Sequence, residues 1–231
     1  MFATQETRSV PTAAPLSFPA LAPRSNASGD LYARSLAAVA PQLPAAARGS
    51  VAGLLAQMPM LVRVVRGRRT KHGDHILPPG RQFSLITVNR SGNPYLFLIT
   101  LLHEIAHARI ARDQAGRARP HGRGWKTVFS SYLLTNLEFF PLDLQPPLAR
   151  YARNPLYSTD ADPALSLALR RHDTLDRRPM VAELPDGQRF ALGGRQVMVK
   201  GPLLRKCYRC TNARGAVFRV AAAVRVQAVL Q

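Results

Sequence analysis

The sequence predicts an α+β chain, in which helices and a small sheet are followed by a small antiparallel β region. Three observations support this class. Helical apolar patterns recur up to about residue 171, two short β-branched runs interrupt them, and alternating runs separated by turn signals follow residue 178. The resulting boundaries are 1–30 for a leader, 31–177 for a main domain and 178–231 for a basic, β-rich C-terminal region.

The composition supports a chain with a packed core. Of the 231 residues, 46% are hydrophobic and 19% are charged. The longest strongly apolar stretch, 95–102, is far shorter than the ~20 residues that cross a bilayer, so we expect no membrane partner. Prolines at 11, 15, 19 and 23 interrupt any secretory signal, and two cysteines are too few for a disulfide framework. The expected location is therefore the reducing cytoplasm.

The N-terminal elements begin with residues 1–30, which are rich in Ala, Pro, Ser and Thr and have no apolar period. We expect this leader to be disordered. Helical patterns follow over 31–58. Within them Pro44 is suited to open a helix over 45–57, because proline fits the first turn.

Two strands are predicted next, over 61–66 and 83–89, because both runs are rich in β-branched residues. A polar connection with glycine joins them. It carries His72 and His75, which could lie near the cleft, although histidines in a loop usually have no special role.

A strongly apolar helix is predicted over 94–112, and a loop marked by Pro120 separates it from a second helix over 125–137. Prolines then divide the chain into short helical pieces, the last over 163–171. Beyond residue 178, turn signals such as Pro-Asp-Gly separate short alternating runs. They predict an antiparallel sheet of four or five strands.

The predicted apolar helix carries the chemistry, in the order His103, Glu104, Ile, Ala, His107. Histidines four residues apart lie on one helical face, so both imidazoles can bind a single Zn²⁺. Glu104 is then adjacent to the metal as a general base for bound water. Three polar side chains would be costly among such apolar flanks unless they were paired or coordinating.

A catalytic zinc usually has three protein ligands and one open position. His121 is the preferred third ligand, since the 13 residues after His107 allow the chain to turn back onto the motif. Asp113 and Glu138 remain alternatives.

The HEIAH motif and the later segment His121-Gly-Arg-Gly-Trp125-Lys126 resemble the SprT-like zinc metallopeptidases. Eukaryotic relatives in this family include Spartan, which degrades proteins crosslinked to DNA. The resemblance covers about 36–137. It implies a zincin-like metallopeptidase domain over 31–177 and one Zn²⁺ per chain, with Glu104 as catalytic base and three zinc ligands: His103, His107 and His121.

The C-terminal region departs from this resemblance. Many bacterial members end in a zinc ribbon with two cysteine pairs, whereas Cys207 and Cys210 form a single pair here. A closed structural site needs four ligands, and the nearest spare histidine, His172, lies well upstream. We therefore expect no complete ribbon.

The charge favours a polyanionic partner. There are 32 basic and 13 acidic residues, a net charge of +19, although 28 of the basic residues are arginine and could reflect a biased genome. Tyr208 and Phe218 alternate with arginines in the β region, where they could stack on bases. The candidate nucleic-acid-contacting residues are Arg117, Arg119, Arg123, Lys126, Arg205, Lys206 and Arg209.

The leading functional hypothesis is a zinc endopeptidase that acts on protein or peptide substrates, including proteins attached to DNA. The alternative is a nucleic-acid-binding or regulatory protein whose zinc site is structural or vestigial. A peptidase without a polyanion partner is the third hypothesis. Tyr132, Tyr151 and Tyr157 are equivalent candidates for stabilising an oxyanion. The sequence predicts no oligomeric state.

Overall fold

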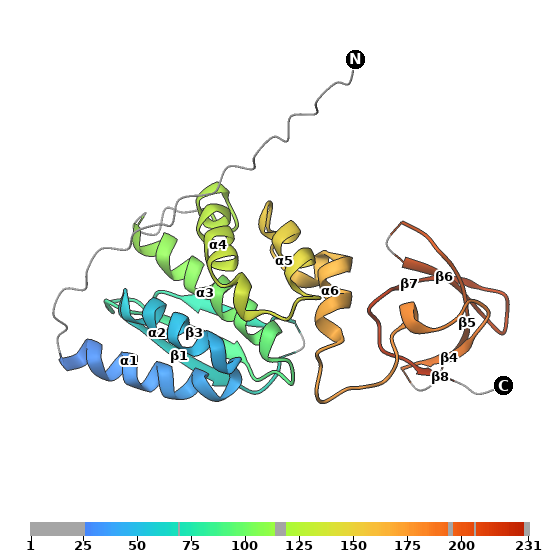
Figure 1. Cartoon of the computed structure of the whole chain (residues 1–231), viewed down its shortest axis with the longest axis horizontal. Helices are drawn as coiled ribbons and strands as arrows, with labels where there is room; N and C mark the ends of the chain where they lie inside the picture. Colours follow the sequence, from blue (N-terminus) through green and yellow to red (C-terminus); the bar gives the residue numbers. More distant parts are fainter. Residues whose placement is uncertain (1–25, 69, 114–118, 194–195, 206, 229–231) are drawn as a thin grey trace, which may run out of the picture.

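A computed structural model describes residues 26–68, 70–113, 119–193, 196–205 and 207–228. The chain is mixed α+β and contains two small sheets. Figure 1 shows the helices grouped with one sheet and the second sheet at the far end of the molecule, beyond α6. None of the helices in the described ranges combines the length and the hydropathy needed to cross a membrane.

The helical part begins one turn earlier than expected, because residues 26–30 of the predicted leader belong to the first helix. An exposed Asp30–Arg34 pair at i,i+4 spacing follows the first turn of this helix. The helices are α1 (Asn26–Val39), α2 (Arg48–Ala56), α3 (Pro94–Asp113), α4 (Arg123–Thr135), α5 (Gln145–Ala152) and α6 (Pro163–Arg170). Single 3₁₀ turns connect them: η1 (Ala40–Gln42), η2 (Ala45–Ala47), η3 (Leu137–Phe139) and η4 (Thr159–Ala161).

The first sheet has the strand order β1-β3-β2, with β1 (Met60–Val65), β2 (Gly73–Ile76) and β3 (Ser84–Asn89). Strands β1 and β3 are parallel, and β2 is antiparallel to β3. Ser35 of α1 donates to the Met60 carbonyl and accepts from the Val62 amide, so α1 covers the outer edge of β1. Strand β2 forms the opposite edge and lies beside α3.

Strand β2 corrects the expectation of a loop between the two predicted strands. Its four residues pair with β3 from Gly73 opposite Val88 to Ile76 opposite Leu85. His75 therefore lies on a strand, and only His72 precedes it in the connection.

Helix α3 is the centre of the first core. It is buried on nearly every side, and it packs against β2, β3 and α4. This explains the all-round apolar pattern of its sequence, because a helix enclosed by other elements has no solvent face to keep polar. The core around it extends from Val39 to Leu169.

The second sheet has the order β7-β6-β5-β4-β8, and all of its neighbouring strands are antiparallel. The 3₁₀ turn η5 (Val181–Glu183) precedes this sheet. Its strands are β4 (Arg189–Leu192), β5 (Gln196–Leu203), β6 (Cys207–Asn212), β7 (Val217–Ala221) and β8 (Gln227–Ala228). A second core, from Val181 to Val226, lies against it. Five strands agree with the four or five that the turn signals predict.

Arg225 connects the two cores. Its side chain is only 9% exposed, and its guanidinium donates to the carbonyl oxygens of Arg170 and Arg178. It also lies 3.3 Å from the Asp173 carboxylate. The second sheet is therefore attached to the C-terminal end of α6 by a nearly buried cation.

Candidate metal centre

Helix α3 places His103, Glu104 and His107 on the wall of a cleft. The helix starts at Pro94 after Asn93, whose side-chain oxygen accepts hydrogen bonds at 3.0 Å from the amides of Tyr95 and Leu96. This cap fixes the first turn. The motif then falls in the second half of the helix, where its buried neighbours hold the backbone rigidly.

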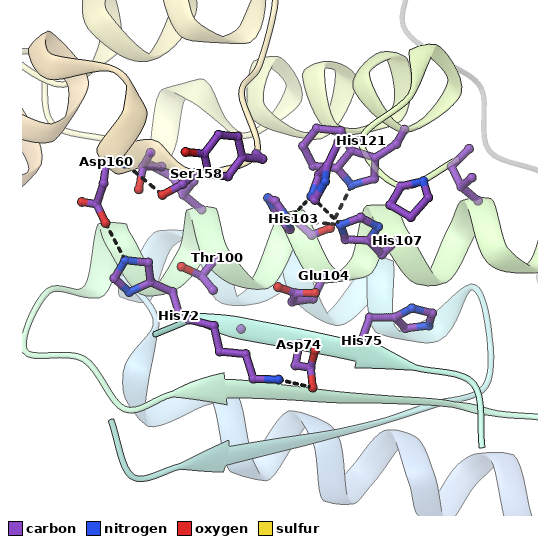
Figure 2. Close-up of a pocket in the computed structure, with 18 of the residues that line it drawn as sticks. His72, Asp74, His75, Thr100, His103, Glu104, His107, His121, Ser158 and Asp160 are labelled. Carbon is purple, nitrogen blue, oxygen red and sulfur yellow. Dashed lines mark hydrogen bonds and ion pairs between the residues drawn. The ribbon is translucent and has the colours of Figure 1, made fainter. Parts of the chain in front are cut away.

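His121 reaches the motif from the segment that leads into α4. Its φ of 55° is the single positive value among the described non-glycine residues. The left-handed conformation is unfavourable for most side chains and is found where surrounding structure enforces it. Here it turns the chain into α4, and the imidazole points back to α3, as Figure 2 shows.

The three imidazoles converge on one point. Their Nε2 atoms are separated by 3.1 Å (His103–His107), 3.1 Å (His107–His121) and 3.2 Å (His121–His103). Two ligands bound to Zn²⁺ at ~2.0–2.1 Å and at a tetrahedral angle are about 3.3 Å apart. The three nitrogens therefore fit one face of a metal coordination sphere. Among the described residues this is the one group of His, Cys, Asp and Glu with such spacing.

Hydrogen bonding alone does not satisfy these nitrogens. Each nitrogen is either a donor or an acceptor, so among three that touch one another at least one pair must be alike. A cation that accepts three lone pairs removes this conflict. Burial, with mutual repulsion between the rings, lowers the pKa of His103 to about 3 and of His107 to about 4, and burial also lowers the pKa of His121. All three are thus held neutral, as metal ligands must be.

Trp125 forms the back wall of the histidine group. The indole is 1% exposed, and the centroid of its ring lies 4.7, 5.2 and 4.6 Å from the ring centroids of His103, His107 and His121, respectively. Its Nε1 atom lies 3.5 Å from the His103 carbonyl oxygen. One rigid side chain therefore packs against all three candidate ligands and limits how their rings can rotate.

Glu104 lies between the histidines and β2 (Figure 2). It is 6% exposed, and no described residue donates a hydrogen bond to its carboxylate. Burial, reinforced by the nearby Asp74 charge, raises its pKa to about 8, against the opposing influence of Arg68 and Lys71. Glu104 lines the cleft, so its carboxylate is open to a ligand or to water there.

The two alternative third ligands lie elsewhere. Asp113 is engaged by Arg109, with a distance of 2.8 Å between the Arg109 Nε and Asp113 Oδ2 atoms. Glu138 is exposed in η3. Neither joins the histidine group, so the expectation that His103, His107 and His121 are placed to bind a metal ion is confirmed.

The cleft has a volume of about 590 Å³ and runs between β2, α3 and η4. His72 and Asp160 meet across one end, with 2.9 Å between Nε2 and Oδ2. This contact lowers the pKa of Asp160. His75 also lines the cleft, and its ring is parallel to that of His107 at 6.4 Å.

The three tyrosines are no longer equivalent once the fold is known. Tyr132 is buried in the core, and Tyr151 donates its hydroxyl to the Leu156 carbonyl oxygen. Tyr157 is 70% exposed and is the one of the three that lines the cleft.

The five described candidates for nucleic-acid contact lie at three places. Arg119 borders the metal cleft, while Arg123 and Lys126 line a separate groove on α4. Arg205 and Arg209 are exposed on the second sheet, and Arg117 and Lys206 lie outside the described residues.

The two aromatic residues and the two cysteines of the second sheet differ in their exposure. Tyr208 packs partly against the second core, with the Lys200 ammonium 4.2 Å from its ring centre. Phe218 is 36% exposed. Cys207 is half-buried and Cys210 is fully buried, and both are free thiols.

No model of a protein family matches the chain, and no similar protein was found among curated proteins or solved structures. The functional argument therefore depends on the geometry of this site.

Proposed function

We propose that this protein is a zinc-dependent endopeptidase of the SprT-like type, with a zincin-like domain around α3. The observation that carries the proposal is the convergence of three Nε2 atoms within 3.2 Å of one another, beside a buried carboxylate that lacks a protein donor. This donor set suits Zn²⁺, which prefers imidazole nitrogen and keeps an open position in catalytic sites.

The chemistry is peptide hydrolysis. Zn²⁺ held by the three histidines would supply Lewis acidity for a bound water and for the scissile carbonyl. Glu104 accepts the proton of the attacking water on a carboxylate oxygen and later delivers it to the departing amine. Burial raises the Glu104 pKa, and the positive charge of a bound Zn²⁺ would lower it again, so that the carboxylate would be ionised before it accepts this proton. In this proposal the cleft would hold the peptide, and the hydroxyl of Tyr157, which lines the cleft, would donate to the oxyanion.

The test compares wild type with Glu104→Gln on a denatured, fluorescently labelled protein. Zinc content and the thermal unfolding midpoint should be retained, while turnover falls by about 10²–10⁴-fold. Glu138→Gln is the matched control, since Glu138 is exposed and outside the cleft. Full activity in Glu104→Gln would exclude the general-base role.

A polyanion partner is the second candidate function, and a specific groove favours it. Arg123, Lys126 and Arg153 line a groove of about 500 Å³ that has no acidic residue in its wall. The Lys126 ammonium is bonded to the Asn154 side-chain oxygen at 2.7 Å instead of to a carboxylate. Three cations without a neutralising partner in this groove suit phosphates of DNA.

This partner is tested by the salt dependence of DNA binding. Three phosphate contacts weaken binding by about 40-fold between 50 and 200 mM salt, and removing one cation reduces the logarithmic slope by about 1. Arg153→Gln should show this reduction. Arg34→Gln, which changes an exposed arginine on α1, should not. If the wild type binds DNA without ever cleaving protein, the regulatory or vestigial-site alternative is correct.

We also place the protein in the reducing cytoplasm, in keeping with its two free thiols.

A further inference from the structure

Strand β2 approaches the motif most closely at Gly73, which faces Glu104. A Cβ atom at Gly73 would lie 2.4 Å from the Glu104 Oε1 atom, 2.8 Å from its Cγ and 2.9 Å from its Cδ. Real Cβ contacts are not this short. The Glu104 carboxylate therefore occupies the volume that any other residue at position 73 would fill.

The backbone at Gly73 does not itself require glycine. The described glycines with positive φ are at 80, 187, 193 and 215, so Gly73 has a conformation open to all residues. Glycine within a strand is unfavourable for stability, because it loses more conformational freedom on folding. The close approach to Glu104 is thus the structural reason for glycine at this position.

Glu104 has little else to orient it. Described residues donate no hydrogen bond to its carboxylate, and the ring of Trp125 packs against the histidines instead. The β2 backbone at Gly73 forms the wall on one side of the carboxylate. Two residues further along β2, the ring of His75 lies parallel to that of His107. The same strand therefore borders both the proposed base and one proposed ligand.

We propose that Gly73 is a positioning residue for the hydrolysis: its missing side chain lets the Glu104 carboxylate lie against β2, at the distance from the three histidines that proton transfer needs. This inference rests on the proposed endopeptidase function. It adds a requirement that lies outside the HEIAH motif, on a neighbouring strand.

The loss of rate caused by one added methyl group at position 73 can be estimated. Bringing the 2.4 Å contact to an ordinary separation of at least 3.4 Å requires the carboxylate to move by about 1 Å. A displacement of this size at a reacting group costs on the order of 10²-fold in rate. The three atoms nearest to the added carbon all belong to Glu104 and none to a histidine, so zinc binding should survive.

The experiment measures kcat, KM, zinc content and the Co²⁺ absorption spectrum of Gly73→Ala in the full chain. We expect kcat to fall about 100-fold while KM, one zinc per chain and the Co²⁺ spectrum stay as in wild type. Gly53→Ala is the matched control, because an exposed glycine on α2 with no atom within 4 Å of its added Cβ should tolerate the change.

Each other outcome overturns the inference. Unchanged kcat shows that Glu104 does not depend on Gly73, and loss of zinc or an altered Co²⁺ spectrum shows a merely structural role. An inactive wild type refutes the endopeptidase function, and this inference with it, whereas an active Gly73→Ala refutes the inference alone. If Gly73→Ala does not fold, Gly73→Ala/Glu104→Ala must fold, because it removes the colliding carboxylate. Failure of that double variant also overturns the proposal.

Discussion

Replacing His121 tests the metal site most directly, because it removes the one proposed ligand outside the helix. Asparagine is the appropriate replacement. His121 has a φ of 55°, and asparagine accepts this left-handed conformation better than alanine does, so the variant isolates the loss of the imidazole from backbone strain.

The expected loss can be estimated from the ligand count. The free energy of zinc binding at four-ligand sites is about 10–16 kcal/mol, or about 2.5–4 kcal/mol per ligand. With three protein ligands whose nitrogens are already 3.1–3.2 Å apart, removing one should weaken zinc binding by about 10²–10³-fold. At a zinc concentration 100 times the wild-type Kd, zinc should stabilise the wild type by about 2.7 kcal/mol, and most of this stabilisation should be absent in His121→Asn.

The assay is competition with a chromophoric chelator, together with thermal unfolding in the presence of zinc or EDTA. His172→Asn is the matched control, because His172 contacts Asp143 at 3.0 Å and lies away from the cleft. Wild type and control should both gain stability from zinc, and His121→Asn should gain little. A Kd for His121→Asn within threefold of wild type would refute the three-histidine site.

Three further predictions concern the surroundings of the site and the second core. Trp125→Ala removes an indole that is 1% exposed, and should lower the free energy of unfolding by about 3–5 kcal/mol in urea; a loss below 1 kcal/mol would contradict its role as back wall. Lys200→Met leaves the buried Leu184 carbonyl oxygen without its donor, so the free energy of unfolding should fall by about 1–3 kcal/mol. An unchanged urea midpoint would contradict this prediction. His72→Ala removes the main cause of the low Asp160 pKa, which should rise toward its ordinary value in a carbon-13 NMR titration; an unmoved pKa would assign the shift to another group.

The sequence alone is sufficient to predict those elements whose residues form a clear local pattern. Helix α3 combines a continuous apolar run with a motif at helical spacing, so its position and the closeness of His103 and His107 followed directly. His121 was found by chemistry rather than pattern, since a catalytic zinc needs a third ligand. Its left-handed backbone could not be foreseen, because the surrounding fold imposes it.

The features that the sequence does not predict depend on contacts between segments distant in sequence. Strand β2 has four residues, two of them polar or charged, and its strand conformation depends on pairing with β3. Gly73 carries no local signal, since its φ is ordinary and its significance comes from a helix distant in sequence. Asp160 likewise acquires its place at the cleft only when η4 meets His72.

The attachment of Arg225 to the end of α6 has a mechanical consequence. Helix α6 begins at Pro163, directly after η4, which carries Asp160 on the cleft wall. We therefore expect a displacement of the segment that carries Arg225 to act on α6, and through η4 on the cleft wall at Asp160, at the end of the cleft away from the three histidines (Figure 2).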